Sequence, residues 1–320
     1  MSTQIEVILV TEPLVEAPLD WLRGQAEVIE ASPTSQAFAE RAHQATGLVV
    51  RTYTNVNESL LARLPRLRVV GRAGVGVDNI DLAACTARNI SVVHTPDANT
   101  QAVVEYVVCL LADALRPRTL LDRAVSLEEW ESLRSRTAPA RQMSEMTLGI
   151  LGLGRIGSRI AAVAGAIGFR VLFNDLLSKD PRECHGATAV TLEQLCRDSD
   201  VLTLHIDGRP SNRRFVSERL IHLLRDDVTL LNTCRGMVID EMALARFLAT
   251  HPRARASLDV HDPEPFTSDS PLLGLANALL APHLASRTST AMTNMSWVVR
   301  DVVAVLQGRA PTHQARVHEA

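Results

Sequence analysis

The sequence predicts an α/β protein made of two Rossmann-like domains with parallel sheets. Short apolar runs recur along the chain with helix-like stretches between them, an alternation typical of βαβ units. These runs lack polar alternation, as strands do when both faces of a parallel sheet are covered. The alternation stops at a polar segment, residues 118–145, and then starts again, which indicates a second sheet.

In chain order, the first sheet is expected to take strands from residues 5–10, 47–50, 67–71 and 90–93, with helices over 59–64 and 81–88. Residues 100–115 have apolar side chains at helical spacing and end before Pro117, so a longer helix is expected there. The polar segment after it is interpreted as an arm or connector. Strands of the second sheet are expected at 148–151, 170–173, 201–206, 228–232, 256–260 and 279–280, followed by a last helix at 289–306.

Composition and charge exclude several classes of function. The 33 Lys and Arg residues are balanced by 36 Asp and Glu residues, so neither nucleic acid nor an anionic membrane is an expected partner. Lys179 is the only lysine, which leaves little scope for Schiff-base chemistry. The five cysteines are odd in number and widely spaced, so neither a disulfide framework nor a metal site is expected. With no basic leader and no apolar run of membrane-spanning length, the protein is expected to be cytoplasmic.

A glycine-rich turn gives the strongest single signal. A predicted strand runs into a G-x-G-x-x-G turn formed by Gly152, Gly154 and Gly157, and then into a helix. Gly152 permits the tight turn, Gly154 lets backbone N–H groups approach a pyrophosphate, and Gly157 lets helix and strand pack closely. Asp175 ends the next strand, where a carboxylate accepts from adenosine ribose hydroxyls and repels a 2′-phosphate. The pattern predicts a dinucleotide site that prefers NAD over NADP.

Three residues with side chains suited to catalysis follow later strands of the second sheet. Arg235, Glu264 and His283 each come shortly after a predicted strand, and ligands of open α/β sheets bind at the carboxyl ends of strands. A planar guanidinium suits a carboxylate and polarises a carbonyl beside it, and a histidine can donate a proton near neutral pH. Glu264 would orient the imidazole, and Asp259 would hold the carboxamide of a nicotinamide. The set predicts hydride transfer on a small 2-oxo acid.

Over almost its whole length, the chain resembles the D-2-hydroxyacid dehydrogenase family. The residues that carry the resemblance are 71–81, 148–157, 204–205, 232–236, 259–265 and 282–283. The resemblance implies NAD-dependent interconversion of a small D-2-hydroxy acid and its 2-oxo acid, with Arg235, Glu264 and His283 at the catalytic positions. It also places Val75 and Gly76 on a backbone turn that binds the substrate carboxylate. Further cofactor contacts are expected at Arg155, Ile156, His205, Cys234 and Ser286.

The same resemblance implies a domain organisation and an oligomeric state. A discontinuous substrate domain, residues 1–98 with 287–320, would surround an inserted NAD-binding domain, residues 99–286. The protein would be a homodimer that acts on a small anionic substrate and uses no metal.

The substrate remains open between alternatives. Arg51, Tyr53 and Arg72 resemble the phosphoglycerate dehydrogenase branch, where arginines meet a distant phosphate, although Tyr53 is bulkier than expected. The two arginines could equally form structural bonds between strand ends. Cys234 also resembles the phosphite-oxidising branch, so a phosphite or hydroxyphosphonate dehydrogenase is one alternative, and a non-catalytic, NAD-sensing, corepressor-like protein is another.

The chain also departs from the family pattern. Asp207, Gly208 and Arg209 stand shortly after the segment 204–205, where the family usually has a proline, a small apolar residue and a threonine. These residues either alter contacts near the nicotinamide or form a surface Asp–Arg pair.

Overall fold

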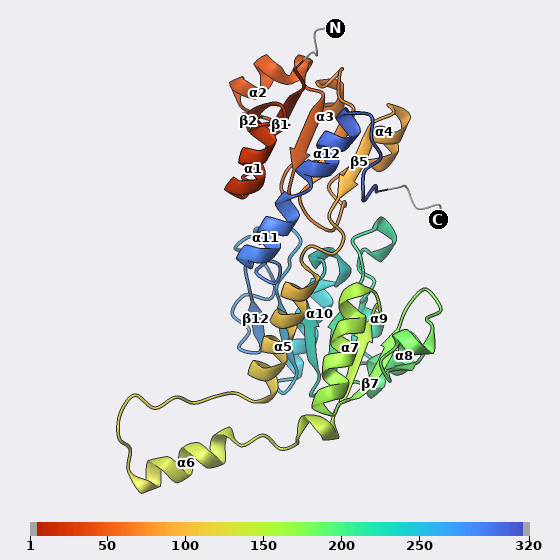
Figure 1. Cartoon of the computed structure of the whole chain (residues 1–320). Coiled ribbons are helices and arrows are strands. Elements are labelled where there is room, and N and C mark those ends of the chain that lie inside the picture. Colours follow the sequence, from red (N-terminus) through yellow and green to blue (C-terminus); the bar gives the residue numbers. More distant parts are fainter. Residues whose placement is uncertain (1–4, 316–320) are drawn as a thin grey trace. The chain divides into compact units, whose positions relative to one another are not determined.

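The computed structural model describes residues 5–315 and divides the chain into two α/β units (Figure 1). The terminal unit comprises the residues up to Asn99 together with those from Ser286 onward. The inserted unit comprises Thr100–Ala285. The chain therefore leaves the terminal unit once and returns to it.

The terminal unit is built on a sheet of five parallel strands in the order β2-β1-β3-β4-β5. Its two central apolar strands, β1 and β3, are buried along their whole length, while β2 at the edge is half-exposed. The strands are β1 (Val7–Val10), β2 (Glu27–Glu30), β3 (Gly47–Val50), β4 (Val69–Arg72) and β5 (Ser91–His94). The helices are α1 (Glu16–Arg23), α2 (Gln36–Arg41), α3 (Glu58–Ala62), α4 (Leu82–Ala87), α11 (Ser289–Ser296) and α12 (Val299–Leu306).

The C-terminal helix of the terminal unit packs directly on its sheet. A Cβ atom at Gly71 in β4 would lie 2.4 Å from a methyl group of Val302 in α12, so the glycine allows this close approach. Val298, Val299, Val302 and Val303 are buried in this contact. The single helix expected over 289–306 is two helices, because the helical run is interrupted between Ser296 and Val299.

The inserted unit is built on seven parallel strands in the order β12-β11-β10-β9-β6-β7-β8. Apolar clusters cover both faces of this sheet, which explains the continuous apolar runs of its strands. The strands are β6 (Thr147–Leu151), β7 (Arg170–Asn174), β8 (Thr188–Ala189), β9 (Val201–Leu204), β10 (Thr229–Asn232), β11 (Arg255–Leu258) and β12 (Ala278–Leu280). The helices are α5 (Thr100–Leu115), α6 (Leu127–Thr137), α7 (Arg155–Ile167), α8 (Leu192–Asp198), α9 (Glu218–Ile221) and α10 (Glu241–Thr250).

The polar segment between α5 and β6 forms an arm that projects from the rest of the inserted unit (Figure 1). It contains the helix α6, whose N-cap Ser126 accepts a hydrogen bond from the backbone N–H of Glu129. Arg134 and Arg136 lie in its last turn, where cations offset the helix dipole. No residue of α6 is buried.

The register of the second sheet brings several strand ends to one edge. Leu151 at the end of β6 is paired with Leu204 of β9, Leu204 with Asn232 of β10, and Asn232 with Leu258 of β11. The residues that follow these strands therefore lie along a single edge of the sheet. Within residues 5–315, no helix is both long and apolar enough to cross a bilayer.

Candidate active site

The glycine turn after β6 has the backbone geometry that its sequence predicts. Gly152 has a φ of 93°, and a Cβ atom there would lie 2.6 Å from the carbonyl oxygen of His205. A Cβ atom at Gly157 would lie 2.1 Å from the carbonyl oxygen of Gly152. By contrast, apart from its two chain neighbours, no described residue has an atom within 4 Å of the Cβ position of Gly154, the N-cap of α7. The N-terminus of α7 is thus open to an anionic group, as dinucleotide binding requires.

Asp175 follows β7 and lies against this turn. Its carboxylate accepts hydrogen bonds from the backbone N–H groups of Leu153, at 2.7 Å, and Leu177, at 2.8 Å. The ammonium group of Lys179 lies 3.2 Å from the same carboxylate. The only lysine of the chain therefore stands at the position expected to bind the adenosine ribose.

The loop after β10 holds an unsatisfied polar group. The hydroxyl of Thr233 is buried and has no hydrogen-bond partner among residues 5–315. Buried hydroxyl groups are normally hydrogen-bonded, so a bound molecule with polar groups fits beside this strand end. The neighbouring Arg235 is half-buried, and one of its Nη atoms donates to the carbonyl of Cys234 at 2.6 Å. Burial raises the pKa of the Cys234 thiol to about 11, so it is protonated and a poor nucleophile at neutral pH.

Glu264 and His283 form the central pair of the site. The Nδ1 atom of His283 lies 2.8 Å from Oε2 of Glu264, and both side chains are partly exposed. Burial alone would raise the pKa of Glu264, but the hydrogen bonds from His283 and from the backbone of His261 hold it below its ordinary value. The carboxylate therefore stays ionised and fixes the imidazole through Nδ1. That leaves Nε2 as the ring nitrogen available for proton transfer.

His283 is held in an uncommon backbone conformation. Its φ is 54°, a region that non-glycine residues seldom adopt. Asp259 stabilises the turn, because its carboxylate accepts from the backbone N–H groups of Leu284, at 2.7 Å, and Ala285, at 2.8 Å. The backbone N–H of His283 also donates to the carbonyl oxygen of Asp259. In the structure, Asp259 thus positions the histidine; contact with a nicotinamide carboxamide stays a prediction.

His205 and the departure from the family pattern lie after β9. The Nε2 atom of His205 lies 2.8 Å from the hydroxyl of Thr203, and burial lowers the pKa of the ring to about 3, so it is neutral. The guanidinium of Arg209 donates two hydrogen bonds to the carboxylate of Asp207, the one from Nε being 2.7 Å long. The two charged residues thus form a local pair on the surface.

In the terminal unit, Glu12 organises the loop that contains the predicted substrate residues Arg51 and Tyr53. Its carboxylate accepts hydrogen bonds of 2.9 to 3.1 Å from the four backbone N–H groups of residues 51–54. Burial alone would raise the pKa of Glu12, but these four donors hold it below its ordinary value. Tyr53 itself is exposed.

Arg51 lies near a second arginine of the same unit. Its guanidinium donates to the carbonyl of Pro13 at 3.0 Å, and burial together with the charge of Arg287 lowers its pKa. Arg72 turns back over Gly74, where a Cβ atom would lie 1.3 Å from an Nη atom of that arginine. Val75 is the residue after Gly74. Its carbonyl oxygen lies 2.8 Å from Nδ1 of His94. Val75 and the next residue, Gly76, are half-buried.

Substituting Glu12 with glutamine is expected to lower the free energy of unfolding by about 2 kcal/mol at neutral pH, because a partly buried set of four charge-assisted hydrogen bonds is weakened. The folded-state pKa of Glu12 is lowered, so the contribution of its carboxylate is complete above the ordinary value of 4.5 and is lost as the pH falls through the folded value. Denaturant unfolding at several pH values measures this. A stability difference that persists unchanged at acid pH would contradict the role given to the carboxylate.

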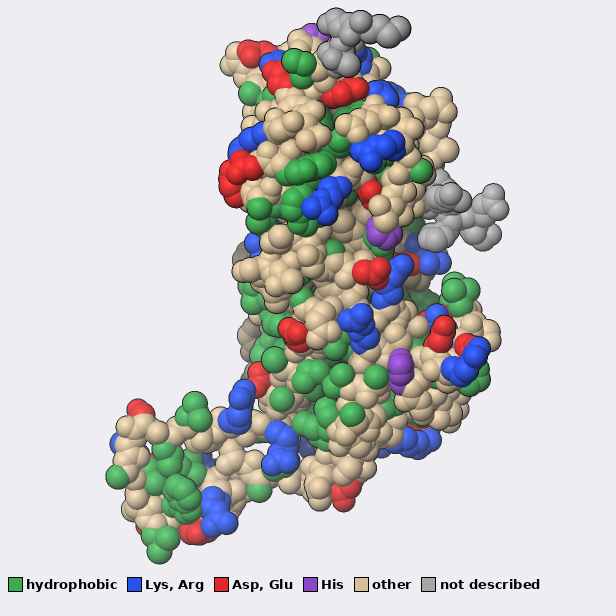
Figure 2. All heavy atoms as spheres, in the orientation of Figure 1, with side chains coloured by type: hydrophobic (Ala, Val, Ile, Leu, Met, Phe, Trp, Pro, Cys, Tyr) green, Lys and Arg blue, Asp and Glu red, His purple; other side chains and the backbone are tan. Residues whose placement is uncertain are grey.

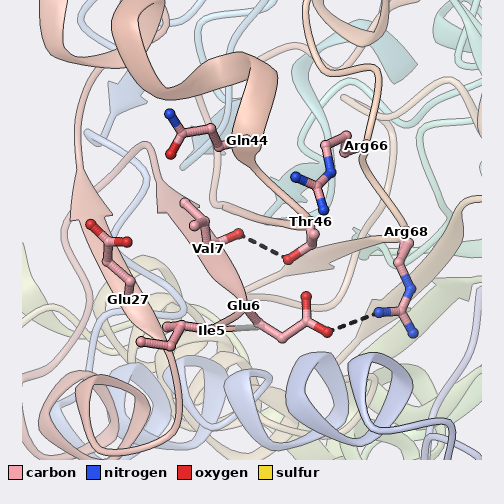
Figure 3. A pocket seen from close by; sticks show the side chains of 8 residues that line it. All are labelled: Ile5, Glu6, Val7, Glu27, Gln44, Thr46, Arg66 and Arg68. Carbon is pink, nitrogen blue, oxygen red and sulfur yellow. Dashed lines mark hydrogen bonds and ion pairs between the residues drawn. The ribbon is translucent and has the colours of Figure 1, made fainter. Parts of the chain in front are cut away.

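A separate hollow of about 500 Å³ lies at the amino ends of strands in the terminal unit (Figure 3). In it, Arg68 pairs with Glu6 at 2.9 Å, and the hydroxyl of Thr46 donates to the carbonyl of Val7. The predicted substrate residues follow β3 and β4 at their carboxyl ends. This hollow is therefore distinct from the candidate site.

The family model for the NAD binding domain of D-isomer specific 2-hydroxyacid dehydrogenases matches residues 108–285, more than half of the chain. The chain belongs to the D-isomer specific 2-hydroxyacid dehydrogenase family. Its inserted unit is accordingly an NAD-binding domain, in agreement with the open N-terminus of α7 and the buried hydroxyl of Thr233.

Known proteins resemble this dehydrogenase-family chain along most of its length. It is 32% identical over 305 residues to D-3-phosphoglycerate dehydrogenase from Archaeoglobus fulgidus, covering 94% of this chain and 57% of that protein. It is 34% identical over 285 residues to glyoxylate reductase from Aeropyrum pernix, covering 87% of this chain and 85% of that protein. The crystal structure of D-lactate dehydrogenase from Aquifex aeolicus, complexed with NAD and lactic acid, matches with a TM-score of 0.81 at 26% identity, covering 95% and 96% of the two chains. The chain thus spans little more than half of the phosphoglycerate dehydrogenase.

Four residues near the predicted site residues of this family member were missed from the sequence. They are Glu12, Lys179, Thr233 and Arg287. Glu12 and Arg287 acquire their places through contacts with residues distant in sequence, and Thr233 is distinguished by its burial without a hydrogen-bond partner among residues 5–315, so no local motif marks these three. Lys179, by contrast, is paired with Asp175, four residues before it. The single occurrence of lysine was a signal that could have drawn attention to Lys179.

Proposed function

We propose that this chain catalyses the NAD-dependent interconversion of a D-2-hydroxy acid and its 2-oxo acid. The observation that carries the proposal is the pairing of His283 Nδ1 with Glu264 Oε2 at 2.8 Å in a domain that binds NAD. A carboxylate that fixes one ring nitrogen prepares the other for proton transfer. Arg235, which follows the neighbouring strand β10, supplies the fixed cation that a carboxylate substrate needs.

In the direction of reduction, the guanidinium of Arg235 binds the substrate carboxylate and polarises the 2-oxo group. NADH, when bound, would supply the hydride that adds to the carbonyl carbon. Nε2 of His283 gives its proton to the carbonyl oxygen as the C=O π bond breaks and the alcohol forms. Glu264 stabilises the imidazolium before the transfer and holds the ring in place after it. We also propose that Val75 and Gly76 offer backbone N–H groups to an acidic substrate.

We further propose that the substrate carries a second anionic group. The charge of Arg287 contributes to lowering the pKa of Arg51, and an anion bound beside the two guanidinium groups would offset that repulsion. Guanidinium groups bind phosphate and carboxylate oxygens through paired hydrogen bonds. Two of the similar proteins are named as a D-3-phosphoglycerate dehydrogenase and a glyoxylate reductase. The acid in the first name has a second anionic group, and the acid in the second name has none.

A nucleotide absorbance assay with a substrate panel, run in both directions, tests the proposal. The panel contains glyoxylate, hydroxypyruvate, pyruvate, 3-phosphoglycerate, phosphite and hydroxymethylphosphonate. We expect the highest kcat/KM for a carboxylic acid with a second anionic group. Turnover confined to phosphite or the phosphonate would overturn the proposal, and binding of NAD without any turnover would favour a sensing role.

The same assay with NAD and NADP tests the cofactor preference. Asp175 repels a 2′-phosphate, while the ammonium group of Lys179, 3.2 Å from its carboxylate, offsets part of that charge. We expect NAD to have the lower KM. Replacing Lys179 with methionine should widen the preference for NAD.

We also propose that the protein is a homodimer in which the arm around α6 contacts a second copy. A helix of 11 residues with none buried is marginal in water unless it packs against something. Leu120 is 90% exposed and Leu127 is 77% exposed, and Figure 2 shows hydrophobic side chains gathered on the arm. Surfaces of this kind on a folded protein mark contacts with other chains.

The double substitution of Leu127 and Trp130 with glutamate is expected to convert the dimer into a monomer, since charges placed on a buried apolar surface oppose association. Size-exclusion chromatography with light scattering measures the mass. Substitution of Met242, an exposed apolar residue of α10, with glutamate is the control and should leave the mass unchanged. A wild-type chain that is monomeric, or a double variant that stays dimeric, would refute the role of the arm.

A further inference from the structure

Residue His261 lies where the loops that carry Arg235, Glu264 and His283 meet. It is 8% exposed, and it follows β11 by three residues. No sequence pattern points to a catalytic role for this histidine. Its contacts in the structure reach all three loops.

The first contact is with the loop of Glu264. The backbone N–H of His261 donates to Oε1 of Glu264 at 3.0 Å, while Oε2 of the same carboxylate binds His283. The two oxygens of Glu264 are thus engaged from two sides. The orientation of the carboxylate toward His283 depends on where the backbone of His261 lies.

The second contact is with the loop of His283. The ring Nε2 of His261 lies 2.8 Å from the carbonyl oxygen of Ala281, a contact that is buried. Because a carbonyl only accepts, this nitrogen must carry the proton and donate it. Ala281 stands two residues before His283, so the hydrogen bond fixes the start of the turn in which His283 has its positive φ. Phe266 packs against the ring of His261, with centroids 4.6 Å apart.

The third contact is with the segment after Arg235. A Cβ atom at Gly236 would lie 2.0 Å from the carbonyl carbon of His261, so the backbones of these two residues touch. Any displacement of the His261 backbone would therefore shift Gly236, the residue next to Arg235. Buried packing of this density transmits small shifts rather than absorbing them.

We propose that His261 is a positioning residue that holds the Glu264–His283 pair in register with Arg235 through its ring hydrogen bond to Ala281. It touches neither substrate nor cofactor in this role. The inference rests on the proposed dehydrogenase function. It adds a determinant of proton transfer that lies outside the three catalytic residues.

Three substitutions of His261 separate the hydrogen bond from the bulk of the ring. His261→Phe keeps a ring but removes the donor, His261→Gln places an amide N–H near the position of Nε2, and His261→Asn places it too close to the backbone to reach Ala281. We expect His261→Phe and His261→Asn to lower kcat about tenfold with the KM for the nucleotide unchanged. We expect His261→Gln to recover most of that loss.

The matched control is His251→Phe. His251 also makes a 2.8 Å ring contact with a backbone carbonyl, that of Phe247, and it stacks on the Phe247 ring at the end of α10. Among residues 5–315, it forms no hydrogen bond or ion pair with Glu264 or with the turn of His283. This variant should keep the wild-type kcat, even if its melting temperature falls as much as that of His261→Phe.

A second measurement does not depend on turnover. Carbon NMR of the Glu264 carboxyl in the full chain, without added nucleotide, follows its titration in each variant. The groups that face this carboxyl are His283, His261 and Asp259. In His261→Phe, we expect the pKa of Glu264 to rise towards its ordinary value, because its hydrogen bonds are weakened, and in His261→Gln we expect it to stay low.

The outcomes distinguish this inference from the proposed function. A wild-type chain that turns over no acid in the panel would remove the proposed function, while the Glu264 titration would still report on His261. Wild-type kcat and an unchanged Glu264 titration in His261→Phe would overturn the inference. A loss of kcat in His261→Phe that His261→Gln does not recover would also overturn the inference, because a general packing defect would then be sufficient to explain the loss.

Discussion

Substituting His283 with asparagine is expected to lower kcat by about 10²- to 10⁴-fold, the usual contribution of a positioned general acid. Asparagine cannot supply a proton, yet it tolerates the φ of 54° at this position better than alanine does. The dissociation constant for NADH should therefore remain at the wild-type value. Steady-state kinetics and nucleotide fluorescence titration measure the two quantities.

The partner of His283 provides an internal check. If Glu264 acts only through the imidazole, then Glu264→Gln should lower kcat in the wild-type background but have little further effect once His283 is asparagine. His251→Asn, which changes another ring bound to a backbone carbonyl, is the control and should leave kcat unchanged. Turnover retained by His283→Asn would remove the histidine from the mechanism.

Much of the architecture could be predicted because local pattern and tertiary environment agree. The helix α5 and the strand β3 have the predicted bounds, since each is an uninterrupted apolar pattern ended by a clear signal. The edge strands β2 and β8 have no such pattern, because an edge strand is covered on fewer sides and can contain polar residues. The break between α11 and α12 was also missed, as helical spacing continues through Trp297 and Val298.

The candidate site divides in the same way. Gly152, Gly157 and Asp175 belong to a motif in which each position has its own structural requirement. The sequence therefore predicts their geometry. The position of Asp259 could be predicted, but its binding of two backbone N–H groups in the turn of His283 could not. Contacts such as those of His261 depend on how three loops pack, which no local pattern contains.

Substitution of Arg235 is expected to have the second large effect on turnover. We expect Arg235→Lys to lower kcat/KM on the order of 10²-fold, although the charge is kept. A lysine ammonium is a point donor that cannot bind the carboxylate in a bidentate manner and polarise the carbonyl at the same time. Arg219→Lys, at an exposed arginine paired with Glu193, is the control and should have no effect.

A substrate that lacks the carboxylate charge tests whether Arg235 binds the carboxylate. The methyl ester of the best acid in the panel lacks the carboxylate, so the wild-type enzyme should use it poorly. If Arg235 recognises the carboxylate, then Arg235→Lys should reduce kcat/KM much less for the ester than for the acid, because the interaction is already absent. Equal reductions for acid and ester would mean that the arginine acts on the carbonyl or on the fold of its loop. In the second of these cases, the hydrogen bond from Arg235 to the backbone carbonyl of Cys234 would be its principal contribution.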